Sequence, residues 1–157
     1  MQNLSAKYGK TLNLDKLTSY CPGCGHGIVT RLVAEAIETL GIRERAIAIV
    51  GIGCGGFSHH YMDVDAIEAT HGRSPSFAVG YKLCRPDNIV FTYCGDGDSC
   101  AIGLGDLMHA ANKGMPITSI MVNNSVFGMT GGQMAPTTLL GMKTATTPYG
   151  RDPRLNG

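Results

Sequence analysis

The sequence of 157 residues has almost no net charge, no run of basic residues and no long apolar stretch. Its 13 lysines and arginines are balanced by 12 aspartates and glutamates, so it lacks the electrostatic footprint of a nucleic-acid-binding or anionic-membrane-binding protein. The longest apolar run, residues 46–52, is far too short to cross a bilayer. Residues 1–20 also lack the apolar core of a signal peptide. We therefore expect a cytoplasmic protein with no nucleic-acid or membrane partner.

The absence of an export signal also bears on the six cysteines. They are predicted to be reduced thiols or metal ligands rather than a disulfide framework. Glycine, by contrast, is abundant, at 22 of 157 residues, which is about twice its usual share. The glycines cluster at residues 23–27, 51–56, 95–105 and 128–132, between apolar runs. This pattern is typical of backbone loops that approach a ligand closely.

Hydrophobic patterning predicts helices and strands that alternate along the chain. Helices are predicted over residues 28–40, 74–84 and 99–113, and strands over residues 46–52, 88–94 and 117–123. The second helix opens at Ser74-Pro75, which is read as an N-cap followed by a first-turn proline. The apolar stripe of the first helix consists of Ile28, Leu32, Val33, Ala36, Ile37 and Leu40.

This order of elements predicts an α/β fold with a doubly wound, mostly parallel sheet. Ligands of such sheets bind at the carboxyl ends of the strands, where the glycine-rich loops fall. No internal repeat is visible. We expect residues 1–20 to form an N-terminal arm and residues 21–157 to form one domain. From Pro136 onward the chain is rich in Thr, Pro and Gly and has no closing element, so we expect this domain to be incomplete at its C-terminus.

A carboxylate and an amide follow two successive predicted strands. Asp96 comes directly after the second strand, and Asn124 directly after the third. Magnesium prefers oxygen ligands and shares them with substrate phosphates. Asp96, the Asn124 amide oxygen and a backbone carbonyl of the following turn, best placed at Val126, therefore predict a magnesium ion that holds a diphosphate.

The glycines around these residues favour the same interpretation. Gly95, Gly97 and Gly128 would let backbone N–H groups face phosphate oxygens, and the helix near residue 99 would point its positive end there. Ordinary Asp-Gly and Asn-Asn turns are the alternative. Against that alternative, Gly103 and Gly105 lie inside the intervening helix, where each costs about 1 kcal/mol relative to Ala. We expect this backbone to lie close against another group.

A second group of candidate ligands is formed by cysteines. Cys21 and Cys24 are two residues apart in a CPGCGHG segment, and Cys54 follows in a glycine-rich loop. Such thiolates can bind a metal ion or two corners of a cluster. From spacing alone, zinc, with His26 as a further ligand, and an iron–sulfur cluster are equally supported. Ordinary buried cysteines and, less well, a redox dithiol are the other interpretations.

His71 and Arg73 precede the predicted helix at residue 74. Basic side chains at a helix N-terminus can meet a carboxylate or a phosphate. A surface pair near the helix cap is the alternative, and it is the better interpretation when these two residues are considered alone.

Together, these motifs resemble the thiamine-diphosphate-binding β subunit of 2-oxoacid:ferredoxin oxidoreductases of the 2-oxoglutarate or 2-oxoisovalerate type. A lone GDG would be weak, but the ordered set is specific and covers nearly the whole chain. The segments are residues 20–27 (YCPGCGHG), 69–73 (ATHGR), 91–98 (FTYCGDGD) and 122–138 (VNNSVFGMTGGQMAPTT).

The resemblance implies a thiamine-diphosphate-binding fold and assigns roles to residues of this chain. Magnesium would be held by Asp96, Asn124 and the Val126 carbonyl, and His71 would lie near the thiamine diphosphate. His71 and Arg73 are the candidate catalytic residues. A [4Fe–4S] cluster would be ligated by Cys21, Cys24 and Cys54. The residues implied to line thiamine diphosphate are Ile52, Gly53, Cys54, Gly55, His71, Gly95, Gly97, Asp98, Gly128 and Met129.

The fourth cysteine of the family lies beyond the end of this sequence, and Cys84, Cys94 and Cys100 do not match it by position. We therefore expect the chain to be a fragment. The implied reaction is the conversion of a 2-oxoacid, coenzyme A and oxidised ferredoxin into acyl-CoA, carbon dioxide and reduced ferredoxin. No glutamate here matches the residue that activates the aminopyrimidine, which in the family belongs to the α subunit. The resemblance thus implies a heteromer that is active only with that partner.

Two alternatives remain at this point. A non-oxidative thiamine-dependent decarboxylase or synthase would share the GDG–Asn pair but would not need the three cysteines. A zinc-stabilised, non-catalytic binding module would use the cysteines but not the thiamine site. The substrate cues conflict, since Phe57 suits a branched or aryl 2-oxoacid, whereas Arg73 could pair with the distal carboxylate of 2-oxoglutarate.

Overall fold

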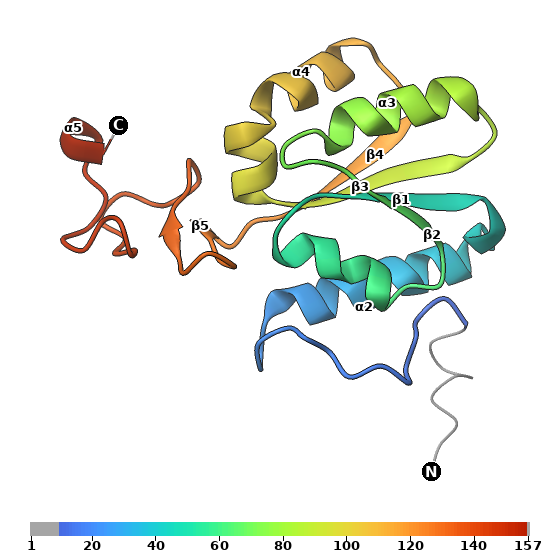
Figure 1. The fold of residues 1–157 in the computed structure, drawn as a ribbon, viewed down its shortest axis with the longest axis horizontal. Helices are drawn as coiled ribbons and strands as arrows, with labels where there is room; N and C mark the ends of the chain where they lie inside the picture. The colour runs from blue at the N-terminus through green and yellow to red at the C-terminus, as the bar shows by residue number, and fades with distance from the viewer. Residues whose placement is uncertain (1–9, 157) are drawn as a thin grey trace.

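A four-stranded parallel sheet forms the centre of the molecule (Figure 1). The structure, a computed structural model, describes residues 10–156, so the first nine residues of the predicted arm lie outside it. The strands are β1 (Ala46–Val50), β2 (Asp65–Glu68), β3 (Ile89–Gly95) and β4 (Ile117–Val122), in the spatial order β2-β1-β3-β4. The predicted parallel α/β sheet is confirmed. Strand β2 was missed because its sequence, DAIE, is short and half charged.

Helices cover both faces of the sheet, as the doubly wound prediction requires. Helix α2 (Gly25–Thr39) lies on one face, and α3 (Ser74–Cys84) and α4 (Leu104–Asn112) lie on the other (Figure 1). Successive side chains of β1 point to opposite faces of the sheet and enter two separate cores. Ala48 and Val50 pack with α2, and Ile47 and Ile49 pack with α3. All five residues of β1 are buried, which explains its continuous apolar sequence.

The buried face of α2 differs from the predicted one. Ile28 and Leu32 are 56% and 49% exposed, while His26 and Thr30 are buried. The reason lies in β3, because the Tyr93 hydroxyl is 3.4 Å from His26 Nδ1 and 3.2 Å from Thr30 Oγ1. A polar pair that shares a buried hydroxyl therefore replaces part of the expected apolar stripe.

The predicted helix over residues 99–113 is divided in two. A π-helical segment, η3 (Asp98–Ile102), is followed by Gly103 and then by α4. A Cβ atom at Gly103 would lie 2.5 Å from the Gly72 carbonyl oxygen, so the close approach expected there is present. The same expectation is wrong for Gly105, where a Cβ would meet no atom within 4 Å.

The remaining elements are short. Two 3-10 segments, η1 (Arg43–Arg45) and η2 (Cys54–His60), flank β1. After β4, the two-residue strands β5 (Val126–Phe127) and β6 (Gln133–Met134) form a hairpin, and the chain leads away from the sheet to α5 (Pro153–Asn156) (Figure 1).

The N-cap of α3 is Arg73 rather than Ser74, which is already helical. In residues 10–156, no helix combines the length and hydrophobicity that a membrane span needs.

The two glycines of the divided helix provide a matched test. Gly103→Ala should lower the free energy of unfolding by about 1–3 kcal/mol, because its methyl group must displace backbone atoms of the Gly72 loop. Gly105→Ala should instead raise it by up to about 1 kcal/mol, the propensity difference in a helix. Urea denaturation followed by circular dichroism measures both. If both substitutions changed the free energy of unfolding in the same direction, the packing described for Gly103 and Gly105 would be contradicted.

Candidate functional site

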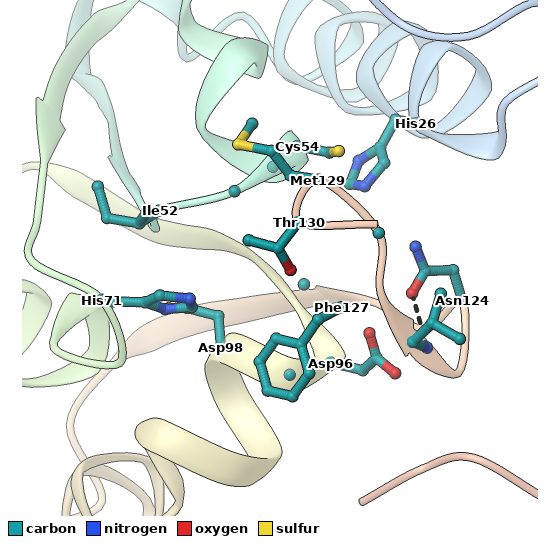
Figure 2. A pocket seen from close by; sticks show the side chains of 16 residues that line it. His26, Ile52, Cys54, His71, Asp96, Asp98, Asn124, Phe127, Met129 and Thr130 are labelled. Atoms are coloured by element: carbon teal, nitrogen blue, oxygen red, sulfur yellow. Dashed lines mark hydrogen bonds and ion pairs between the residues drawn. The ribbon is translucent and has the colours of Figure 1, made fainter. Parts of the chain in front are cut away.

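A cavity opens at the carboxyl edge of the sheet, where the loops after β1, β3 and β4 meet (Figure 2). It contains every residue that the sequence assigned to magnesium or thiamine diphosphate, from Ile52 in the first loop to Met129 in the last. The sequence predicted these loops to converge, and the parallel register brings them together. The lining residues are His26, Ile52, Gly53, Cys54, Gly55, His71, Gly95, Asp96, Gly97, Asp98, Asn124, Val126, Phe127, Gly128, Met129 and Thr130.

The two predicted oxygen ligands lie on one side of this cavity (Figure 2). Asp96 is only 1% exposed, and its Oδ2 atom accepts a hydrogen bond from Thr137 Oγ1. The Asn124 Oδ1 atom accepts the backbone N–H of Val126 at 3.2 Å and keeps a second lone pair. A carboxylate, an amide oxygen and nearby backbone carbonyls form a donor set that fits magnesium shared with phosphates.

His71 extends into the cavity from the opposite side and is held by Asp98 (Figure 2). The Asp98 Oδ1 atom accepts the Gly72 N–H at 2.6 Å and is also paired with His71 Nδ1. Since a carboxylate is an acceptor, the hydrogen of this pair belongs to Nδ1, which leaves Nε2 for other partners. Asp98 is 3% exposed, whereas the side chain of His71 is 33% exposed.

The room for Asp98 comes from Gly51, at the end of β1. A Cβ atom at this position would overlap the Asp98 carboxylate and would lie 3.1 Å from Cys94 Sγ. The Asp98 Oδ2 atom on this side has no hydrogen-bond partner among the described residues. Burial, with Asp98 close by, raises the pKa of the Cys94 thiol to about 12, so this cysteine stays protonated.

Arg73 does not line the cavity, although it is only two residues from His71. Its guanidinium forms an ion pair with Asp106 at the start of α4. The Ser76 hydroxyl and Arg73 hold the pKa of Asp106 below its usual value. Phe57 also lies outside the cavity and contacts the rings of Tyr20 and His60 instead. Both sequence cues for the substrate are therefore placed elsewhere.

The three predicted cluster cysteines, called the cysteine corner below, are near enough for two of them to act electrostatically on the third. Cys54 lines the cavity, and Cys21 and Cys24 are linked by a turn in which Cys24 N–H donates to Cys21 O at 2.9 Å. Burial raises the pKa of Cys54, and the nearby Cys24 and Cys21 thiols raise it further. All three are free thiols. Cys54 thus joins the cavity to the cysteine corner.

The zinc interpretation gains no support from this arrangement. In the described part of the chain, no three His, Cys, Asp or Glu side chains are grouped to hold one metal ion. His26, a candidate zinc ligand, stacks on Tyr20 with ring centroids 5.2 Å apart and approaches the Tyr93 hydroxyl. Burial lowers its pKa, so its neutral form is favoured. A cluster spreads its cysteines over several iron atoms and does not need such a tight group.

Sequence reasoning missed several residues at this site. His26 was considered only as a zinc ligand, and Phe127, Thr130 and Thr137 were given no role. The ring of Phe127 lies against Gly97, where a Cβ atom would overlap it. A signal existed for these residues, since all of them lie in the segments that carry the family resemblance. That signal did not reveal which of them face the cavity.

Comparison with known proteins places the chain in a family. Residues 33–156 match the thiamine pyrophosphate enzyme family, C-terminal TPP binding domain. Over 140 residues, the chain is 49% identical to ketoisovalerate oxidoreductase subunit VorA of Methanothermobacter thermautotrophicus, covering 89% of this chain and 29% of the relative. Over 148 residues, it is 41% identical to 2-oxoglutarate synthase subunit KorB of Archaeoglobus fulgidus, covering 94% and 55%.

A solved structure agrees. The 2-oxoglutarate:ferredoxin oxidoreductase from Magnetococcus marinus, with 2-oxoglutarate, coenzyme A and succinyl-CoA bound, matches with a TM-score of 0.86 and 36% identity, covering 96% of this chain and 51% of that one. The predicted family and the thiamine-binding fold are confirmed. The chain spans 29% of the VorA relative and about half of the other two proteins.

The contact between Gly51 and Asp98 yields a stability prediction. Gly51→Ala should lower the free energy of unfolding by about 1–3 kcal/mol, because the new methyl group overlaps a buried carboxylate. Gly80→Ala is the matched control, since a Cβ atom at Gly80 in α3 would meet nothing within 4 Å, and it should not destabilise the protein. Chemical denaturation compares the two variants. Equal stability would show that Asp98 does not need the space at Gly51.

Proposed function

Since the chain belongs to the thiamine pyrophosphate enzyme family through its C-terminal TPP binding domain, we propose that it acts in a 2-oxoacid:ferredoxin oxidoreductase as the β subunit. The reaction joins a 2-oxoacid and coenzyme A, releases carbon dioxide and passes electrons to ferredoxin. The observation that carries the proposal is the convergence of three glycine-rich loops and two oxygen ligands on a cavity that shares Cys54 with the cysteine corner.

In this proposal, the cavity binds the diphosphate end of magnesium–thiamine diphosphate. Asp96, Asn124 and the Val126 carbonyl hold the magnesium ion, and the glycine loops present backbone N–H groups to the phosphate oxygens. Thiamine diphosphate, when bound, supplies a nucleophilic carbon and an electron sink for decarboxylation.

His71 has a separate role in the proposed site. The pair with Asp98 keeps hydrogen on Nδ1 and orients the ring, so Nε2 is the atom offered to the cofactor or substrate. Asp98 is thus a positioning residue and does not itself have to contact the diphosphate. Arg73 has no catalytic role in this proposal, because its charge is paired with Asp106 outside the cavity.

Cys21, Cys24 and Cys54 are the proposed ligands of a [4Fe–4S] cluster from this chain. The electrostatic influence of Cys24 and Cys21 on Cys54 supports this assignment, and because Cys54 lines the cavity, such a cluster would lie beside it. A non-oxidative thiamine enzyme has no need for these three cysteines, so their presence favours the redox function. The α subunit is the proposed partner, and ferredoxin is the proposed electron acceptor.

The substrate is proposed only as a 2-oxoacid. With Arg73 paired to Asp106, this chain offers no argument for a distal carboxylate, and Phe57 gives none for a branched chain. The named relatives include both a ketoisovalerate and a 2-oxoglutarate enzyme.

Reconstitution with the α subunit tests the function. The assembled enzyme should reduce a viologen dye with a 2-oxoacid, and the rate should depend on both thiamine diphosphate and coenzyme A. Rates with pyruvate, 2-oxoisovalerate and 2-oxoglutarate, measured side by side, identify the substrate. No dye reduction with any of them would overturn the proposal, and turnover without electron transfer would favour the non-oxidative alternative.

The cluster assignment is tested by a pair of cysteine variants. Cys54→Ser should lower the iron and acid-labile sulfide content of anaerobically purified enzyme, because serine replaces a thiolate ligand. Cys84→Ser is the matched control, since Cys84 is an exposed free thiol at the end of α3 and should leave both contents unchanged. Equal iron contents in the two variants would remove Cys54 from the ligand set. One zinc per chain with no iron would support the binding module.

A further inference from the structure

Two adjacent threonines, Thr137 and Thr138, contact the two loops that carry the proposed magnesium ligands. They follow the β5–β6 hairpin and belong to the PTT sequence at the end of the family-like segments. The Thr137 hydroxyl donates to Asp96 Oδ2. The Thr138 hydroxyl donates to the carbonyl oxygen of Ser125, the residue after Asn124, at 2.5 Å. One short segment therefore reaches the loop after β3 and the loop after β4.

The contact from Thr137 determines which Asp96 oxygen is available. Asp96 is 1% exposed, so its carboxylate has little access to solvent. The Thr137 hydroxyl occupies one lone pair of Oδ2, whereas Oδ1 accepts no hydrogen bond from the described residues and keeps both of its lone pairs, which favours a cation bound mainly through Oδ1. Magnesium requires a compact octahedron, whereas calcium takes six to eight oxygens and often binds both oxygens of a carboxylate. A carboxylate restricted in this way suits magnesium better than calcium.

The contact from Thr138 fixes the position of the second loop. Thr138 is 2% exposed, and its hydroxyl also accepts the Ala135 N–H at 2.9 Å, so this side chain has a set orientation. Ser125 has φ of 64°, a left-handed conformation that is unfavourable for a residue with a Cβ atom. Asn123 Oδ1 accepts the Ser125 N–H at 3.0 Å, and Thr138 binds the Ser125 carbonyl. The strained residue beside Asn124 is therefore held through both its N–H and its carbonyl.

We propose that Thr137 is a positioning residue that restricts Asp96 to binding the cation through one oxygen, while Thr138 anchors the same segment to the Asn124 loop. Residues 135–138 thereby set the spacing of the two ligands and select magnesium over calcium. This inference rests on one part of the proposed function, namely that Asp96 and Asn124 hold the cation of a bound diphosphate. It assigns a role to threonines that the proposed reaction does not otherwise use.

The test is cation-dependent binding of thiamine diphosphate to the assembled α–β enzyme after removal of metal and cofactor. Calorimetry at fixed thiamine diphosphate gives the magnesium and calcium concentrations for half-maximal binding. Thr137→Val keeps the shape of the side chain but removes the hydroxyl, and it should raise the magnesium requirement by about tenfold. The calcium requirement should rise less or fall, so that the preference for magnesium over calcium decreases.

Two further variants separate the hydroxyl from general structure. Thr137→Ser retains the hydroxyl and should restore the parental preference for magnesium. Thr118→Val, at an exposed position near the start of β4, should leave both requirements unchanged. Thr137→Ala also lacks the hydroxyl and serves where the valine variant does not fold, as judged by circular dichroism.

The possible outcomes are distinct. The first outcome is that the parent enzyme binds thiamine diphosphate with magnesium and that Thr137→Val needs the same magnesium and calcium concentrations as the parent. The proposed role of Thr137 is then wrong, while the proposed function stands. Equal weakening for magnesium and calcium would also overturn it, because a purely structural residue would act in that way. If the parent shows no magnesium-dependent binding, the proposed function fails, and this inference fails with it.

Discussion

The candidate site depends above all on the parallel register of β1, β3 and β4. Val50 pairs with Tyr93, and Gly95 pairs with Val122, so the three strands end at the same edge of the sheet. Backbone hydrogen bonds in the ladder therefore bring together Gly51, Asp96 and the Asn124 loop. The same register separates the two cores, since residues of β1 alternate between α2 and α3. A shift by one residue would exchange these faces, so that each side chain of β1 would meet the core on the opposite side of the sheet.

Glycines allow the loops at this edge to approach one another. Gly51 leaves space for the Asp98 carboxylate, Gly97 lies against the Phe127 ring, and Gly103 packs against the backbone at Gly72. Each contact joins segments that are far apart in the sequence. Close packing between loops thus explains much of the glycine content. Glycines would also let backbone N–H groups approach the phosphate oxygens of a bound diphosphate. The loop that carries His71 is positioned by the same packing, through Asp98 and Gly103.

The cavity is also connected to two other parts of the chain. Cys54 lines the cavity and is also near Cys21 and Cys24, so a redox centre on these thiols would adjoin the cavity. On the other side, Thr137 and Thr138 tie the segment after the hairpin to the loops of β3 and β4. These connections make the proposed cofactor site, the cysteine corner and the hairpin segment one structural unit.

The sequence by itself determined the parallel α/β class and the loops that meet at the site, and it predicted that Asp96 and Asn124 would come together there. These follow from local periodicity and from the rule that parallel strands end at a common edge. Tertiary structure alone decided the outcomes for residues that are close neighbours in the chain. His71 reaches the cavity, whereas Arg73 pairs with Asp106, and Gly103 is in tight contact, whereas Gly105 is not. Thr137 likewise acquires its partner only through folding. The physical reason is that a side chain's partners come from segments distant in sequence, and local patterns carry no information about which of them will be adjacent.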